Sequence, residues 1–333
     1  MTGGNQTDKR VIMDVRHLKK YFPVQKSRIR IQPKSVKAVD DVSFSVYENE
    51  TFSLVGESGC GKSTTGRCIA GMIGITSGEA RYRGNNIADM TSGEKRLLTR
   101  ELQMIFQDPY SSLNPRMTVG RALEEPLIIH NMCRNKEERA SRVLDILEKV
   151  GMRADHYYRY PHEFSGGQRQ RIGIARALIL NPRLIVCDEP VSALDVSIQS
   201  QILNLLVEIK ESMNVTYVFI SHNMSVVRYI SDRVGVMYLG HLVELAPIEE
   251  LYDNPLHPYT KALLSAVPEA NPHVRKKQII LEGDIPSPLN PPSGCVFHNR
   301  CPEADPVCGD APPQMEEISP GHFVACFHHE LYY

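Results

Sequence analysis

Short apolar runs alternate with longer amphipathic stretches along most of the chain. Residues 51–55, 184–187 and 217–220 are almost continuously apolar and rich in β-branched side chains, which is typical of strands buried on both faces. Residues 39–46 alternate between apolar and polar side chains, which predicts a strand with one buried face. Residues 62–70 have the pattern of a helix. Because buried strands that alternate with helices form parallel sheets, we expect an α/β fold with a mixed, mostly parallel core sheet.

Residues 118–160 form the longest stretch with helical periodicity. Gly151 follows an apolar stripe in this stretch, and glycine commonly ends helices. We therefore expect a helical subdomain at about 118–162, inserted between two halves of the core. The side chains of the stripe are Val143, Leu144, Leu147 and Val150.

The composition changes after Pro268, where Pro, Gly and Cys become frequent and helical periodicity ends. We predict one domain over residues 1–268 and a small C-terminal extension over 269–333. Near the other end, residues 24–38 carry five basic and no acidic side chains. This segment is expected to be a solvated hairpin tip, and contact with phosphates or lipid headgroups is the alternative.

Charge and hydrophobicity exclude several classes of protein. The 333 residues include 38 Lys and Arg against 39 Asp and Glu, a formal net charge of −1, which argues against a dedicated nucleic-acid partner. No apolar run approaches the roughly 20 residues that span a bilayer. The polar residues 1–10 lack the apolar core of a signal peptide. We expect a cytoplasmic chain that reaches a membrane through a partner.

A glycine-rich loop joins the predicted strand 51–55 to the predicted helix 62–70, and it fits the P-loop pattern G-x-x-x-x-G-K-S/T. Its glycines let backbone N–H groups converge on the β-phosphate of a nucleotide. Lys62 can then reach the β- and γ-phosphate oxygens, and Ser63 can offer its hydroxyl to Mg²⁺. Such a motif also occurs by chance, so its weight depends on the rest of the chain. Its residues are Gly56, Glu57, Ser58, Gly59, Cys60, Gly61, Lys62, Ser63 and Thr64.

An acidic pair, Asp188 and Glu189, follows the apolar run 184–187. Asp188 is placed to face Mg²⁺, directly or through water. Glu189 is placed to polarise the water that attacks the γ-phosphate. An isolated acidic pair at a strand end is normally just a solvated terminus, but a P-loop upstream favours the catalytic interpretation.

Six motifs occur here in the order of an ABC-type ATPase cassette, which roughly residues 10–265 resemble. The resemblance implies a P-loop NTPase fold with a mixed, mostly parallel core sheet, an antiparallel β subdomain and a helical subdomain. One departure is Phe164, where the family usually has leucine. In chain order the matching residues are Gly56 to Thr64, Gln107, Ser165-Gly166-Gly167-Gln168, Asp188-Glu189, Ser192-Ala193-Leu194-Asp195 and His222.

The resemblance also implies roles in a head-to-tail dimer, in which each ATP lies between the P-loop of one chain and the signature helix of the other. Ser165, Gly166, Gly167, Gln168 and Asp195 would belong to that second surface, with Ser165 and Gly167 on the γ-phosphate. Glycines at a helix N-terminus suit an anion because they expose N–H donors.

Four further side chains take roles from the same resemblance. His222 would hold the γ-phosphate and the water, and an ordinary strand-end histidine is the alternative. Gln107 would contact Mg²⁺ or the water and relay the nucleotide state to a membrane partner. Phe22 falls at the adenine-stacking position, with Tyr21 as second choice; an aromatic packed beneath the loop is the other interpretation.

Three segments resemble the oligopeptide/dipeptide importer subfamily. They are residues 107–115 (QDPYSSLNP), 257–264 (HPYTKALL) and 18–24 (LKKYFPV), the last typical of the F-type subunit. The resemblance implies a D-type ATPase subunit as partner in a heterodimer, two transmembrane permeases and an extracytoplasmic peptide-binding protein. The chain would then lie at the cytoplasmic face of the inner membrane. A nickel or other small-solute importer, or an ABC ATPase outside transport, remains the alternative.

Four of the eight cysteines gather in the C-terminal extension, with five, six and seventeen residues between them. The absence of a C-x-x-C turn weakens a zinc-ribbon interpretation. Four thiolates in a Pro- and Gly-rich segment fit a 4Fe–4S cluster, as known in related importer ATPases, with Zn²⁺ or free thiols as alternatives. Such ligation would order a segment that has little apolar material of its own. These residues are Cys295, Cys301, Cys308 and Cys326.

Overall fold

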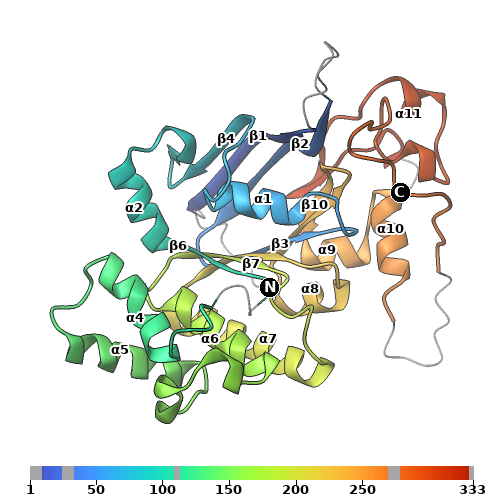
Figure 1. Ribbon diagram of the computed structural model, residues 1–333. Helices are drawn as coiled ribbons and strands as arrows, with labels where there is room; N and C mark the ends of the chain where they lie inside the picture. The colour runs from blue at the N-terminus through green and yellow to red at the C-terminus, as the bar shows by residue number, and fades with distance from the viewer. Residues whose placement is uncertain (1–9, 25–33, 109–112, 269–277, 330–333) are drawn as a thin grey trace, which may run out of the picture. The chain divides into compact units, whose positions relative to one another are not determined.

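A computed structural model describes residues 10–24, 34–108, 113–268 and 278–329 (Figure 1). The chain divides into two compact units, which are treated separately below. Unit 1 contains residues 89–220 and the short segment Tyr47–Glu50. Unit 2 contains Val11–Val46, Thr51–Ala88 and the chain from Ser221 onward. The basic segment predicted as a hairpin tip lies largely outside the described residues.

Unit 2 contains an antiparallel sheet, drawn in blue and teal in Figure 1, with the strand order β2-β1-β4-β5. β1 pairs antiparallel with β4, and β4 with β5. In β2 the apolar side chains of Val42, Phe44 and Val46 are buried, whereas Ser43 is exposed, as the alternating pattern predicts. The strands are β1 (Val11–Pro23), β2 (Ser35–Tyr47), β4 (Ser77–Tyr82) and β5 (Asn85–Asn86), followed by the 3₁₀ turn η1 (Ile87–Asp89).

The second sheet of unit 2 has the order β11-β12-β10-β9-β3. β3 is parallel to β9, and the remaining neighbours are antiparallel. Two of these strands come from the cysteine-containing C-terminal segment, where β12 extends the sheet beyond β10. The strands are β3 (Thr51–Val55), β9 (Arg233–Tyr238), β10 (His241–Pro247), β11 (Glu316–Ser319) and β12 (His322–Val324).

Three helices of unit 2, at residues 224–230, 248–253 and 258–265, contribute to an apolar core that also includes Val236, Tyr238 and Phe297. Phe297 belongs to the C-terminal segment and is 1% exposed, so that segment contributes to the same apolar core. Burying one such aromatic side chain contributes roughly 2–3 kcal/mol. The helical elements are α1 (Lys62–Ile69), α8 (Met224–Ile230), α9 (Ile248–Asp253), α10 (Pro258–Ser265), η4 (His298–Arg300) and α11 (Pro306–Asp310).

Unit 1 combines three parallel strands in the order β8-β7-β6 with a helical region. Every residue of β7 and β8 is buried, as expected for the apolar runs at 184–187 and 217–220. The strands are β6 (Leu102–Ile105), β7 (Leu184–Asp188) and β8 (Thr216–Ile220). The helical elements are α2 (Ser92–Glu101), α4 (Val119–Ile129), α5 (Lys136–Lys149), η2 (Ala154–Tyr158), η3 (Pro161–Glu163), α6 (Gly166–Leu178) and α7 (Val196–Met213).

For one residue of the predicted apolar stripe on α5, Leu144, the prediction that it faces the core is wrong. Leu144 is 38% exposed, while Ile146 is buried beside Val143 and Leu147. A helix of 3.6 residues per turn places residue 144 about 100° away from residue 143, on the outer face. Gly151 ends the helix with φ +73°, as predicted.

The mixed α/β fold with an antiparallel sheet and helical insertion is confirmed. Among the described residues, none of the helices combines the length and apolarity needed to cross a membrane. The predicted boundary between residues 268 and 269 falls at the edge of a segment outside the described residues, and it stays a prediction.

Candidate functional site

Two glycines of the P-loop in unit 2 occupy positions where the backbone conformation and the nearby atoms exclude a side chain. Gly56 has φ +145°, and a Cβ there would lie 2.1 Å from the carbonyl oxygen of Met237. Gly61 has φ +104°, and its Cβ would lie 2.3 Å from the carbonyl oxygen of Ala38. Gly61 is also the N-cap of α1 and has no side chain with which to cap the helix. A helix N-terminus without a capping side chain is a favourable place for an anionic ligand.

The side chain of Lys62 donates hydrogen bonds to the backbone of this loop. Its Nζ lies 2.8 Å from the carbonyl oxygen of Gly56 and 2.9 Å from that of Glu57. The residue is 4% exposed, and a buried ammonium group needs such partners. The lysine, the turn and the helix N-terminus therefore lie together as the sequence predicts, with Ser63 in the first turn of α1.

Glu57, the second residue of the loop, is held by two side chains that sequence reasoning missed. Tyr259 accepts a hydrogen bond from its backbone N–H, and Arg300 contacts its carboxylate. The pairing with Glu57 raises the pKa of the Arg300 guanidinium further above its ordinary value. Tyr259 lies in the segment 257–264 that carries the importer resemblance, which was the available signal. Arg300 had none, because a lone arginine next to a cysteine matches no motif.

The two candidate adenine-stacking aromatics have different surroundings. The Tyr21 hydroxyl donates to Asp40 at 2.5 Å, and burial together with this partner raises the pKa of Tyr21. Phe22 is 41% exposed, with the Lys20 ammonium 4.9 Å from its ring centroid. An exposed ring face can stack on a base, so these surroundings favour Phe22, the first choice from the sequence.

In unit 1, Gln107 and Glu189, two of the predicted hydrolytic residues, meet where parallel strands end. Asp188 ends β7 and is 1% exposed. Glu189 follows with φ +47°, a conformation that is uncommon outside glycine and concentrates at functional sites. Gln107 lies two residues after β6 and donates from Nε2 to a carboxylate oxygen of Glu189 at 3.0 Å. The adjacent carboxyl ends of β6 and β7 bring the two side chains together.

Ser192 is a further residue at this point of unit 1. Its hydroxyl donates to the Glu189 carbonyl at 3.1 Å and lies 3.5 Å from Gln107 Nε2. In the sequence, Ser192 follows the acidic pair closely, but no specific role was predicted for its side chain. It supports the turn that holds the Glu189 backbone.

The predicted signature segment begins α6 in unit 1. Ser165 is the N-cap, and its hydroxyl accepts from the Gln168 N–H while the Gln168 side chain accepts from the Ser165 N–H. Gln168 therefore forms a capping box, and its predicted contact with nucleotide stays a prediction. Asp195 is the N-cap residue of α7 and is exposed. Phe164 is buried and packs edge-on against His156, which accommodates the larger side chain.

His222 lies in unit 2, two residues after the end of the strand β8. The preceding Ser221 is buried, and its hydroxyl accepts from the Asn223 N–H. Asn223 in turn caps α8. His222 is exposed at the start of this turn, so a well-supported backbone presents it.

Residues 39–192 match the family model described as ABC transporter, and residues 243–308 match the oligopeptide/dipeptide transporter C-terminal region. The oligopeptide transport ATP-binding protein AppF of Bacillus subtilis is 53% identical over 98% of this chain and 99% of its own. OppF of Salmonella typhimurium is 51% identical over 96% of both chains, and the dipeptide transport protein DppF of Haemophilus influenzae is 51% identical over 93% and 94%. The chain belongs to the ABC transporter ATP-binding proteins.

Solved structures agree with this family. The ATP-binding cassette MJ0796, a dimer with ADP and Pi, is 28% identical with a TM-score of 0.63, over 71% of this chain and 98% of that one. CbiO1 of Clostridium perfringens has the same fold, with a TM-score of 0.63 at 24% identity over 74% of this chain and 92% of that one. As an ABC ATP-binding protein, the chain is an ATPase that powers transport.

Beyond its ATP-binding motifs, this ABC protein carries a group of cysteines in unit 2. Backbone N–H of Cys295 donates to the Cys308 carbonyl at 2.7 Å, which joins two cysteine loops. Burial raises the pKa of Cys301 to about 11, and the nearby Cys295 and Cys326 add to the shift. Burial likewise raises the pKa of Cys326 to about 11, with contributions from Cys295 and Cys308. Among the described residues, however, the four sulfurs do not form a group whose ligand atoms lie within 4.8 Å of one another.

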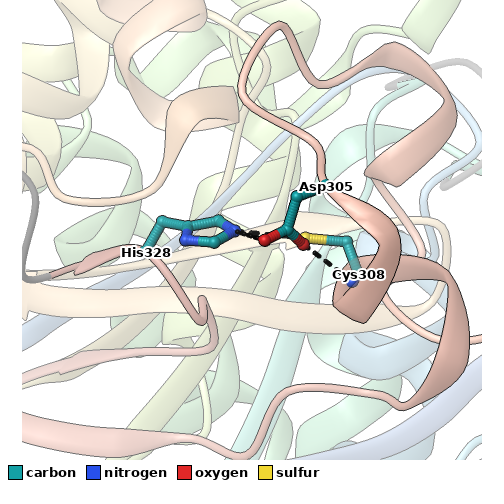
Figure 2. Close-up of side chains that lie close together, drawn as sticks. All are labelled: Asp305, Cys308 and His328. Atoms are coloured by element: carbon teal, nitrogen blue, oxygen red, sulfur yellow. Dashed lines mark hydrogen bonds and ion pairs between the residues drawn. The ribbon is translucent and has the colours of Figure 1, made fainter.

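Two further ligand types lie beside Cys308 (Figure 2). The Nε2 atom of His328 is 3.6 Å from the Cys308 sulfur and 3.3 Å from a carboxylate oxygen of Asp305. Both contacts use the same ring nitrogen, so the three groups do not form a nucleophile–base–acid relay, in which the acid would bind the other nitrogen. Their ligand atoms lie within 4.8 Å of one another, as around a metal ion.

Proposed function

We propose that this chain is the ATP-hydrolysing subunit of an importer of di- and oligopeptides. The observation that carries the proposal is the match of residues 243–308 to the C-terminal region of oligopeptide and dipeptide transporters. Relatives named for oligopeptide and dipeptide transport align over nearly the whole chain. A nickel or other small-solute importer with the same architecture is the alternative.

In this proposal, Glu189 accepts the proton of the attacking water. Gln107 holds the Glu189 carboxylate through its amide N–H, and the left-handed turn at Glu189 fixes the backbone behind it. The P-loop N–H groups and Lys62 bind the β- and γ-phosphates, while His222 contacts the γ-phosphate. Ser165 and Gly167 act on the nucleotide held by a partner cassette, with Gly166, Gln168 and Asp195 shaping that surface.

The side chains proposed for Mg²⁺ are Ser63, Gln107 and Asp188. Their hydroxyl, amide and carboxylate oxygens form the hard donor set that Mg²⁺ prefers, and Asp188 is almost fully buried at a strand end. When bound, Mg²⁺ neutralises phosphate charge.

The proposed assembly contains two ATPases and a membrane part. A D-type ATPase subunit completes the pair of ATP sites as a heterodimer, and the dimeric state of the related MJ0796 cassette supports pairing of this kind. Two transmembrane permeases carry the substrate, and an extracytoplasmic peptide-binding protein delivers it. The chain then works as a peripheral protein at the cytoplasmic face of the inner membrane. The loop after Gln107 is proposed to contact the permeases, and its residues 109–112 lie outside the described residues.

The decisive experiment uses tagged Glu189→Gln protein, purified from native membranes in ATP and Mg²⁺. The amide cannot accept the proton, so we expect ATP hydrolysis to fall by at least about 100-fold with ATP still bound. Mass spectrometry of the trapped complex should find a second ATPase chain and two permeases. Glu208→Gln, the same change on the exposed face of α7, serves as the control and should leave hydrolysis unchanged.

Each outcome of this experiment separates one part of the proposal. Unchanged hydrolysis in Glu189→Gln would contradict the catalytic assignment. Recovery of self-dimers without permeases would contradict the transport assignment and leave the ATPase. A nickel-binding protein encoded with the recovered permeases would favour the alternative substrate class.

We further propose that Cys295, Cys301, Cys308 and Cys326 bind a 4Fe–4S cluster, with Zn²⁺ as the alternative. Four thiols in one short segment with little regular structure fit such a group, and its positive charge would offset the raised pKa values of Cys301 and Cys326. The imidazole and carboxylate beside Cys308 add donors that suit Zn²⁺ (Figure 2). In either case the role is structural, because ligation would tie the loops together.

A further inference from the structure

Arg300 connects the C-terminal segment to the P-loop within unit 2. It ends the turn η4, just before Cys301, and its side chain is 8% exposed. Its two terminal nitrogens donate to the two carboxylate oxygens of Glu57 at 2.8 and 3.2 Å. Such a bidentate pair fixes the direction as well as the distance between the partners.

The aromatic core of unit 2 fixes the same P-loop residue from a second direction. The Glu57 N–H donates to the Tyr259 hydroxyl at 2.8 Å. The Tyr259 ring lies 4.8 Å from the Tyr238 ring and 5.4 Å from the Phe297 ring, and all three side chains are buried. The Tyr238 hydroxyl in turn lies 3.4 Å from Arg300. Tyr259 therefore has little freedom to move, and the loop backbone at Glu57 is fixed with it.

The charge of Glu57 makes this contact relevant to nucleotide binding. Glu57 is a carboxylate in a loop that binds a polyphosphate, and two negative groups repel each other strongly where solvent is limited. A fully charged guanidinium on both carboxylate oxygens cancels most of that repulsion. The lysine of the loop also contacts the Glu57 carbonyl, so a shift of Glu57 would move Lys62.

We propose that Arg300, together with Tyr259, positions the P-loop for ATP by neutralising Glu57 and fixing its backbone. Arg300 is a positioning residue that acts through Glu57. The inference rests on the proposed ATP site in the P-loop. It assigns a supporting role at that site to Arg300 and Tyr259, which lie outside the sequence motifs of the cassette.

The test measures ATP and ADP binding to the full-length chain by calorimetry. We expect Arg300→Gln to raise the Kd for ATP about tenfold, the usual scale for a lost charge-assisted contact. The loss should be smaller for ADP, which carries less charge. If neutralisation is the cause, Glu57→Gln combined with Arg300→Gln should return the Kd to within about threefold of the unmodified value. Arg81→Gln, which breaks the Arg81–Glu79 surface pair on β4, should leave the Kd unchanged.

A second variant keeps the test valid if Arg300→Gln unfolds the chain. Tyr259→Phe removes the hydroxyl that accepts from Glu57 and retains the packed ring, and we expect it to weaken ATP binding several-fold while the chain stays folded, with the melting temperature lower by no more than a few degrees. Unmodified ATP affinity in folded Arg300→Gln and Tyr259→Phe would overturn the role of both residues. A tenfold loss of ATP affinity that persists in the double variant would show that Arg300 does not act by neutralising Glu57. An unmodified chain that binds no ATP would overturn the ATP site as well.

Discussion

Gly166 and Gly167 are equivalent in the sequence motif, yet the structure gives them different neighbours. A Cβ on Gly167 would lie 2.5 Å from a methyl carbon of Ile198 on α7, far below normal contact. A Cβ on Gly166 would meet a carbon of Leu194 at 3.6 Å, an ordinary contact. Both residues lie in the first turn of α6, so the difference comes from how α7 packs against it within unit 1.

Alanine substitutions separate these two glycines. Gly167→Ala should destabilise the chain by about 1–3 kcal/mol, because the stiff β-branched Ile198 must be displaced. Gly166→Ala should be neutral or stabilising by up to about 1 kcal/mol, because alanine favours the helix. Urea unfolding of both variants measures the difference. Equal loss of stability in the two would contradict this packing.

At the scale of elements, Glu244 on β10 connects three segments of unit 2. Its carboxylate accepts from the backbone N–H groups of Leu256 and His257 just before α10. The same carboxylate lies 2.8 Å from the ring of His322 on β12. All four of these residues are buried, so helix α10 and strand β12 are fixed to β10 by one acidic residue.

His257 makes this group sensitive to pH. Burial lowers the pKa of His257 from 6.5 to about 4, although Glu244 acts in the opposite direction. Between these two pKa values the unfolded chain binds a proton that the folded chain does not. The contribution of His257 to the free energy of unfolding is therefore fully present above pH 6.5. It decreases as the pH is lowered through this window and stops changing below about pH 4. The change from pH 7 to pH 5 should cost roughly 2 kcal/mol.

Denaturant unfolding at pH 7 and pH 5 tests this expectation, with His257→Asn as the comparison. Asparagine can accept the Tyr259 N–H as the His257 ring does, which keeps the cap of α10. The variant should lack this part of the pH dependence. If it loses as much stability as the unmodified chain between the two pH values, then His257 is not the responsible group.

At the scale of the whole molecule, the C-terminal segment is part of the structure that supports the P-loop. It contributes Phe297 to the core, Arg300 to Glu57 and two strands to the sheet of unit 2. Metal ligation at the cysteines would therefore stabilise more than the segment itself.

The metal proposal predicts a measurable metal content. The full-length chain, purified without oxygen, should contain iron and acid-labile sulfide at about one cluster per chain, or about one zinc in the alternative. Cys301→Ser should abolish this content and lower the melting temperature. Cys133→Ser, at a half-buried cysteine between α4 and α5, should retain it. An unmodified chain without iron or zinc would contradict the proposal.

Most elements of the fold could be predicted from the sequence because their signals are local. The apolar runs became the buried strands β3, β7 and β8, and the P-loop glycines have the positive φ values that their motif requires. Leu144 was misplaced because spacing alone does not decide which edge of a stripe faces the core. Strands β11 and β12 were missed because they are short and lie in a segment without clear periodicity.

The sequence by itself determined the family and the order of the motifs, and it predicts which residues bind phosphate and take part in hydrolysis. These depend on a few adjacent residues whose backbone needs are set by short-range sterics and hydrogen bonding. Tertiary structure alone decided that Arg300 meets Glu57 across 243 positions, that Gln107 holds Glu189 and that Gly167 abuts Ile198. Contacts between distant segments follow from how whole elements pack together, and no local pattern in the chain encodes them.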